Sequence, residues 1–178
     1  DAPRRERIRL NHSATHLLHA ALREVLGKHV QQKGSLVAPD RLRFDFSHDR
    51  AVTPAELDAI EKTVNAEIRR NSDAEIVELP YREALARGAI AFFGDKYGER
   101  VRVLEAGTRS VELCGGTHVS ALGDIGPMKI VAEGSIGSNL RRIEAVTGTA
   151  PIDRLRAEER VLARSAELVG VSPGARGE

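Results

Sequence analysis

Four side chains in two short motifs have the types and the spacing of a metal site. His12 and His16 lie in NHSATHLLH near the start of the chain, and Cys114 and His118 lie in CGGTH much later. Histidines at i and i+4 of a helix point to the same side, so both imidazoles can reach one ion. A thiolate and a further imidazole complete the four nitrogen and sulfur ligands of tetrahedral zinc. Either motif alone is weak, but together they predict a zinc site.

The role of such an ion stays open at the level of the sequence. Four protein ligands would give a closed, structural site, whereas a water in the fourth position would give a Lewis acid. The ligands come from distant segments, which favours a cleft over a small knuckle. Gly115 and Gly116 would let the backbone approach a substrate or an oxyanion closely. Ser13 replaces the glutamate of the His-Glu-x-x-His proteases, so the chain does not belong to that class.

Three further groups have two interpretations each. His19, one turn beyond His16, is either a third metal-binding nitrogen from the helix or a residue that supports a ligand or packs in the core. Gln32 lies in the polar segment HVQQKGS, which either lines a pocket or forms an exposed loop. The segment GSIGSNLRR at 134–142 either binds phosphate through exposed N–H groups, Arg141 and Arg142, or connects two strands.

Periodicity and capping signals predict the elements that must position these groups. We expect a helix over 11–26, capped by Asn11 and stopped by Gly27, and a second helix over 53–71 that starts with a capping box. A short helix at 81–88 and a charged helix over 152–169 are also expected. The predicted strands are 42–47, 74–80, 101–106, 110–114, 127–135 and 141–148, with a loop at 92–100. This order favours an α+β fold, with a mixed or antiparallel sheet packed with helices, over a doubly wound fold.

Composition limits the class of protein. The 178 residues suit one domain, or one domain with a tail. With 27 basic and 26 acidic residues, the whole chain is no strong polyanion binder, although residues 4–9 are basic. The single cysteine excludes an intrachain disulfide and fits a reducing compartment, so a cytoplasmic location is expected. No apolar run approaches the roughly 18–20 residues of a membrane-spanning helix, and the start of the chain lacks the apolar segment of a signal peptide.

The motifs NHSATHLLHAAL, QKGSLV, RFDFSH, CGGTHV and GSIGSNLRRIEAVTG together resemble the editing domain of alanyl-tRNA synthetase. The AlaX trans-editing proteins and the editing domain of threonyl-tRNA synthetase are similar. The resemblance runs from about Arg7 to Gly148 and implies the second-additional-domain fold of these synthetases. It also implies hydrolysis of serine or glycine wrongly esterified to alanine tRNA.

The resemblance further assigns roles to individual residues. It implies zinc as the cofactor, a place for Gln32 in the editing pocket, and small hydroxyl positions at Ser13 and Thr15. Gln32 and Thr15 are then the candidates for positioning water and for contacting the serine hydroxyl. Arg141 and Arg142 would meet the terminal phosphates of the tRNA. The zinc ligands that the resemblance implies are the four that the spacing suggests: His12, His16, Cys114 and His118.

We expect an editing domain over residues 1–150 and a helix or linker over 151–178 that leads toward a missing C-terminal region of a larger synthetase. No ATP-binding aminoacylation domain is present in these residues. A free-standing trans-editing protein is the alternative of the same class. A non-catalytic tRNA-binding module with structural zinc and an unrelated metal hydrolase acting on a small ester or amide are alternatives of other classes.

Overall fold

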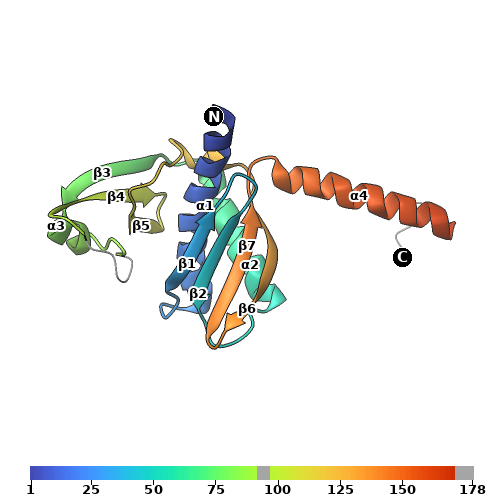
Figure 1. Ribbon diagram of the computed structural model, residues 1–178, viewed down its shortest axis with the longest axis horizontal. Coiled ribbons are helices and arrows are strands. Elements are labelled where there is room, and N and C mark those ends of the chain that lie inside the picture. Colours follow the sequence, from blue (N-terminus) through green and yellow to red (C-terminus); the bar gives the residue numbers. More distant parts are fainter. Residues whose placement is uncertain (92–96, 171–178) are drawn as a thin grey trace.

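The computed structural model describes residues 1–91 and 97–170. Within these ranges the chain forms four α-helices and two antiparallel sheets, so the predicted α+β class is confirmed. Part of the loop expected at 92–100 lies outside the described residues. Figure 1 shows the two sheets side by side, with α1 and α2 behind the larger one.

The larger sheet has the order β1-β2-β7-β6, with every neighbouring pair antiparallel. Its strands are β1 (Gln32–Val37), β2 (Leu42–Ser47), β6 (Lys129–Gly137) and β7 (Leu140–Val146). Phe44 and Phe46 of β2 are fully buried in the main core, as their alternation with polar residues predicted. Burial of such a side chain stabilises the fold by about 1.5–3 kcal/mol.

Helix α1 (Ala2–Leu26) begins well before the predicted start at Asn11. Asp1 caps it by accepting a hydrogen bond from the Arg4 N–H. Asn11 is instead buried inside the helix, where its amide donates to the Ala38 carbonyl and accepts from the Thr147 hydroxyl. Asn11, a residue type that often caps helices, therefore hydrogen-bonds two loops to the helix instead. The stop at Gly27, with φ of 118°, is as predicted.

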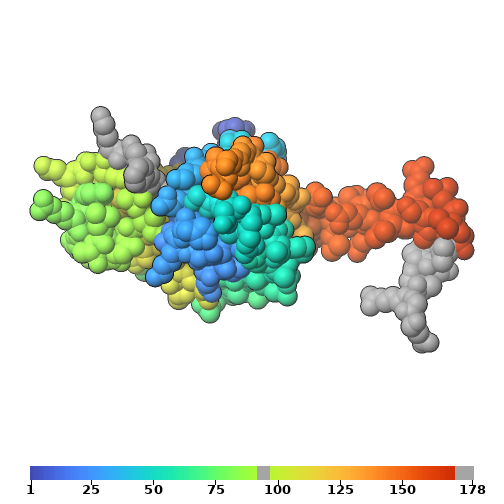
Figure 2. Space-filling model, turned by 90° about the horizontal axis from the view of Figure 1, so that it is seen from below, coloured from blue at the N-terminus to red at the C-terminus, as the bar shows by residue number. Residues whose placement is uncertain are grey.

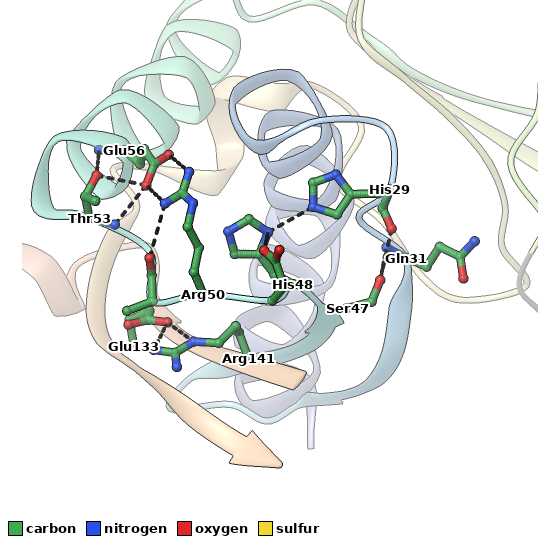
Figure 3. Close-up of polar contacts among 11 residues, drawn as sticks. His29, Gln31, Ser47, His48, Arg50, Thr53, Glu56, Glu133 and Arg141 are labelled. Carbon is green, nitrogen blue, oxygen red and sulfur yellow. Dashed lines mark hydrogen bonds and ion pairs between the residues drawn. The ribbon is translucent and has the colours of Figure 1, made fainter. Parts of the chain in front are cut away.

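Helix α2 (Pro54–Arg70) starts with the expected capping box. The Thr53 hydroxyl accepts from the Glu56 N–H, and the Glu56 carboxylate accepts from the Thr53 N–H. Arg50 adds an ion pair to the same carboxylate (Figure 3). The helix ends at Asn71, whose φ of 53° is the left-handed conformation that asparagine tolerates.

The smaller sheet has the order β3-β4-β5 and its own hydrophobic cluster. Its elements are β3 (Ala74–Pro80), β4 (Arg100–Ala106), β5 (Ser110–Leu113) and helix α3 (Tyr81–Ala86). Helix α1 contacts β1 and β2 of the larger sheet and also β4 and β5 of the smaller one. Because β5 ends one residue before Cys114, this contact brings the CGGTH segment against α1.

Two parts of the chain differ from their predictions. The segment from Gln32, expected as a polar turn or exposed loop, is the edge strand β1, with a register shift between Gln32 and Gly34. Strand β6 continues to Gly137, so the expected loop at 134–140 shrinks to a tight turn at Ser138 and Asn139. The bulge and the small residues hide the alternation by which a strand is recognised.

Helix α4 (Ala150–Val169) has no buried residue and extends away from the rest of the molecule (Figures 1 and 2). The 3-10 turn η1 (Leu122–Ile125) packs against α1 and α2. Across residues 1–91 and 97–170, none of the helices combines the length and the apolarity needed to cross a membrane.

Candidate metal centre

The four predicted ligand residues lie together at the contact between α1 and the end of β5. One donor atom each from His12, His16, Cys114 and His118 falls within 4.8 Å of all the others. The Cys114 Sγ atom lies 3.5 Å from His12 Nε2 and 3.3 Å from His118 Nε2. Zinc bond lengths place tetrahedral ligand atoms about 3.3–3.6 Å apart. The separations around the sulfur therefore already match a tetrahedral set.

Hydrogen bonds set which ring nitrogen faces the cluster. His12 Nδ1 lies 3.2 Å from the Thr117 carbonyl oxygen, and His16 Nδ1 lies 2.5 Å from Glu112 Oε2. Carbonyl and carboxylate oxygens only accept, so both Nδ1 atoms donate these hydrogen bonds and both Nε2 atoms are left as the possible metal ligands. His16 Nε2 is buried, and within the described part of the chain it has no hydrogen-bond partner. A buried ring nitrogen without such a partner, close to a thiolate and two further imidazoles, is what a bound cation would satisfy.

The third histidine is oriented from the helix. Ser13 Oγ lies 3.3 Å from His118 Nδ1 and also accepts a hydrogen bond from the Val119 N–H. Ser13 therefore joins α1 to the loop that carries Cys114 and His118, and it leaves His118 Nε2 facing the sulfur. Such indirect contacts hold metal ligands in place before the ion binds.

Glu112 is the supporting residue that the sequence did not reveal. It is 1% exposed, and its two carboxylate oxygens contact His16 Nδ1 and His19 Nδ1, the latter at 2.8 Å. This contact gives His19 the supporting role that was one of its two interpretations. The available signal was a charged residue in the short apolar strand SVEL, on the same strand face as Cys114 two positions later.

The electrostatics of the cluster favour the thiolate. Burial alone would raise the pKa of Cys114, but the imidazoles of His118, His12 and His16 beside the sulfur outweigh it and lower that pKa to about 3. Burial would likewise raise the pKa of Glu112, and the hydrogen bonds from His16 and His19 lower it. The sulfur is thus present in the only form that binds a metal ion.

Two features fix the CGGTH loop: the close packing of Gly116 against His12, and hydrogen bonds from Arg102. A Cβ atom at Gly116 would stand 2.6 Å from His12 Nδ1, whereas one at Gly115 would meet nothing within 4 Å. Arg102 of β4 donates from Nη1 to the carbonyls of both glycines, at 2.9 Å and 2.7 Å. The space expected for a substrate at Gly116 is therefore occupied by a ligand ring, and only Gly115 borders open space.

Among the described residues, the two predicted catalytic residues, Thr15 and Gln32, make no hydrogen bond to the residues of the metal cluster. The Thr15 hydroxyl is buried in α1 and donates to the Asn11 carbonyl at 2.8 Å. Gln32 is half-buried at the start of the edge strand β1. Its one side-chain hydrogen bond to a described residue goes to Ser35 Oγ, at 3.4 Å.

The two predicted tRNA-binding residues lie on opposite faces of the larger sheet. Arg141 points to the helix-covered face and pairs with Glu133 (Figure 3), whereas Arg142 points outward and forms a bidentate pair with Asp45. Adjacent residues of a strand alternate between faces, so the two guanidinium groups cannot meet the same phosphate. Each is also already neutralised by a carboxylate.

Comparison with known proteins agrees with this arrangement. Residues 101–144, which include Cys114, match the family described as the threonyl and alanyl tRNA synthetase second additional domain. The chain is 62% identical over 170 residues to an alanine–tRNA ligase of Xanthomonas campestris pv. campestris, which covers 96% of this chain and 19% of that protein. The corresponding protein of Stenotrophomonas maltophilia is 60% identical over 172 residues, or 97% of this chain and 20% of the relative.

The fold, the cluster and the family match define a domain of the type that threonyl- and alanyl-tRNA synthetases share. Over nearly its whole length the chain is similar to alanine–tRNA ligases, as its sequence motifs predicted. It spans about a fifth of the length of the curated relatives that it matches.

Proposed function

We propose that this chain is an editing module that hydrolyses the ester bond of alanine tRNA wrongly charged with serine or glycine. The observation that carries the proposal is the convergence of three imidazoles and one thiolate between α1 and the end of β5. The similarity to alanine–tRNA ligases, together with the family match, supports the choice of an aminoacyl-tRNA as substrate.

Zinc is the cofactor that we propose for this cluster. Three nitrogen donors and one sulfur donor suit zinc better than magnesium or calcium, which prefer oxygen. When bound, zinc would supply positive charge that orients the substrate and stabilises developing negative charge. The protein itself offers a full set of four ligands, which favours a positioning role for the ion.

The remaining roles fall to groups of the chain. We assign Gln32 and Thr15 to positioning the attacking water and the hydroxyl of a misactivated serine. A site that hydrogen-bonds a hydroxyl rejects a substrate without one strongly, by up to about 10⁴-fold, which separates serine from alanine. Glycine lacks the hydroxyl too, so admitting glycine while rejecting alanine would need steric exclusion of the alanine methyl group. Ser13 and Glu112 hold the imidazoles, and Arg102 holds the loop.

We further propose that the editing domain spans residues 1–150 and that 151–178 forms a linker within a larger synthetase. The absence of any buried residue along the described length of α4 supports a boundary near residue 150. The similarity to a limited portion of much longer ligases supports the second half of this proposal.

A deacylation assay with seryl-, glycyl- and alanyl-tRNA side by side tests the function. We expect hydrolysis of the first two, little hydrolysis of the third, about one equivalent of zinc, and loss of activity in Cys114→Ala. Release of no amino acid, with equal binding of the three tRNAs, would favour a non-catalytic module with structural zinc. Turnover of serine methyl ester without tRNA would instead indicate a general esterase.

A further inference from the structure

A line of basic and imidazole side chains follows one face of α1. Arg5, Arg9, His12 and His16 are spaced four, three and four residues apart, which places them on the same side of the helix. The helix rise puts Arg9 about 4.5 Å and Arg5 about 10 Å along the axis from His12. The two arginines therefore continue the ligand face toward the N-terminal end of α1, which Figure 1 shows extending past the sheets.

A hollow of about 260 Å³ lies over this line, between Ala2, Arg5, Glu6, Arg9 and Thr117. Thr117 belongs to the loop that carries Cys114 and His118, and its carbonyl accepts the hydrogen bond from His12. The hollow thus begins at the residue that borders the metal cluster.

The charges in this hollow are only partly compensated. Arg9 forms an ion pair with Glu6, but its buried Nε atom has no hydrogen-bond partner among the described residues. Arg5 is exposed, and its side chain makes no ion pair within residues 1–91 and 97–170. Glu6 is the one carboxylate that lines the hollow beside two guanidinium groups, and Asp124 acts on Arg9 from outside it. Arg5 thus has no carboxylate partner among the described residues, in contrast to Arg141 and Arg142, which are each paired with one.

We propose that Arg5 and Arg9 form a phosphate subsite for the 3′ end of the RNA substrate. The inference rests on the proposed function, because it takes the scissile ester to lie at the cluster. That ester is on the terminal ribose, so the phosphate that joins this nucleoside to the preceding one follows directly outside the site. Guanidinium groups recognise phosphate through two parallel N–H bonds, and the Arg5 and Arg9 guanidinium groups that line the hollow supply such donors.

The test compares two substrates that differ only in their phosphates. Serine is esterified either to alanine tRNA or to the 3′ oxygen of free adenosine, which carries no phosphate. For Arg5→Ala and Arg9→Ala we expect KM for seryl-tRNA to rise about tenfold, since a charged hydrogen bond is lost, with kcat within about twofold. Hydrolysis of seryl-adenosine should not change. Arg4→Ala is the matched control, because Arg4 is exposed on the same helix about 100° away from this face.

Two further measurements separate binding of phosphate from a general structural role. Each arginine variant should reduce the salt slope of log KM for seryl-tRNA by about one, as expected for one lost phosphate contact. Glu6→Gln should lower KM, because it removes the carboxylate that pairs with Arg9 in the hollow.

Equal loss of activity toward both substrates, or no change in either, would overturn the subsite. Fluorescence anisotropy with a short RNA that ends in CCA and carries a non-hydrolysable seryl amide supplies an arm without catalysis. If wild-type protein hydrolyses neither ester, the proposed function fails. The anisotropy measurement still tests the subsite in that case. The subsite is supported if Arg5→Ala and Arg9→Ala weaken binding while Arg4→Ala does not, and it is overturned otherwise.

Discussion

Gly116 lies directly against the ring of His12, although 103 intervening residues separate the two in the chain. A side chain at Gly116 would occupy the same space as the imidazole, so the ligand geometry depends on this glycine. We expect Gly116→Ala to displace His12 and to weaken zinc binding by about 10–100-fold, the range found for residues that orient ligands. Metal content after dialysis and competition with a chelator measure the effect.

Gly115→Ala is the matched control for this prediction, because a Cβ atom there meets nothing within 4 Å. It should bind zinc like the wild type. Equal zinc affinity in the two alanine variants would show that the close approach of Gly116 to His12 does not control the site.

Glu112 orients two imidazoles, and its removal should act through them. In Glu112→Gln the amide can still accept one hydrogen bond, but it cannot serve both His16 and His19 as acceptor. We expect about a tenfold loss of zinc affinity with the fold retained by circular dichroism. Cobalt substitution gives a spectroscopic readout, since the d–d bands should change in position. Glu75→Gln, an exposed change on β3, should leave these bands unaltered.

Arg102 positions the metal-binding loop from the neighbouring strand. Arg102→Ala removes the donor shared by the Gly115 and Gly116 carbonyls, so the loop should become mobile and zinc dissociation should be faster. Arg102→Lys should restore part of the effect, because an ammonium group can still donate to one carbonyl. Arg100→Ala, two residues earlier on β4, removes a bond to the Glu78 carbonyl away from the loop and serves as control. Identical dissociation rates in Arg102→Ala and Arg100→Ala would contradict this role.

The pair formed by His29 and His48 should make stability depend on pH. His29 Nε2 lies 2.9 Å from His48 Nδ1 (Figure 3). The charges of Asp49, Arg50 and Glu56 also act on His48. Burial, followed by the charges of Arg50 and His29, lowers the pKa of His48 below its ordinary value of 6.5. The unfolded chain therefore takes up a proton that the folded chain does not, so stability falls as the pH drops through 6.5.

The variant His48→Asn should remove this part of the pH dependence. Urea unfolding at pH 7.5 and pH 5.5 measures it, as a smaller difference between the two free energies of unfolding in the variant. An unchanged difference would mean that His48 does not titrate with unfolding.

Local order along the chain was open to prediction from the sequence. The capping box at Thr53, the stop at Gly27 and the alternating strand of Phe44 and Phe46 all depend on neighbours within a few residues. The ligand pair His12 and His16 is of the same kind, since the helix period alone puts both rings on one side. A longer helix than predicted leaves that relation unchanged, because it adds turns without changing the phase.

Contacts between distant segments were decided by the tertiary structure. The placement of Gly116 under His12, the Arg102 bonds to the loop and the Glu112 contacts join segments that only packing brings together. Arg141 and Arg142 point to opposite faces of the larger sheet because their segment is a strand, and helices cover only one of these faces. Residue type and spacing thus determined which groups could bind a metal ion. The packing of α1 between two sheets decided which residues hold the metal ligands in place. It also decided which arginines remain free to meet a phosphate.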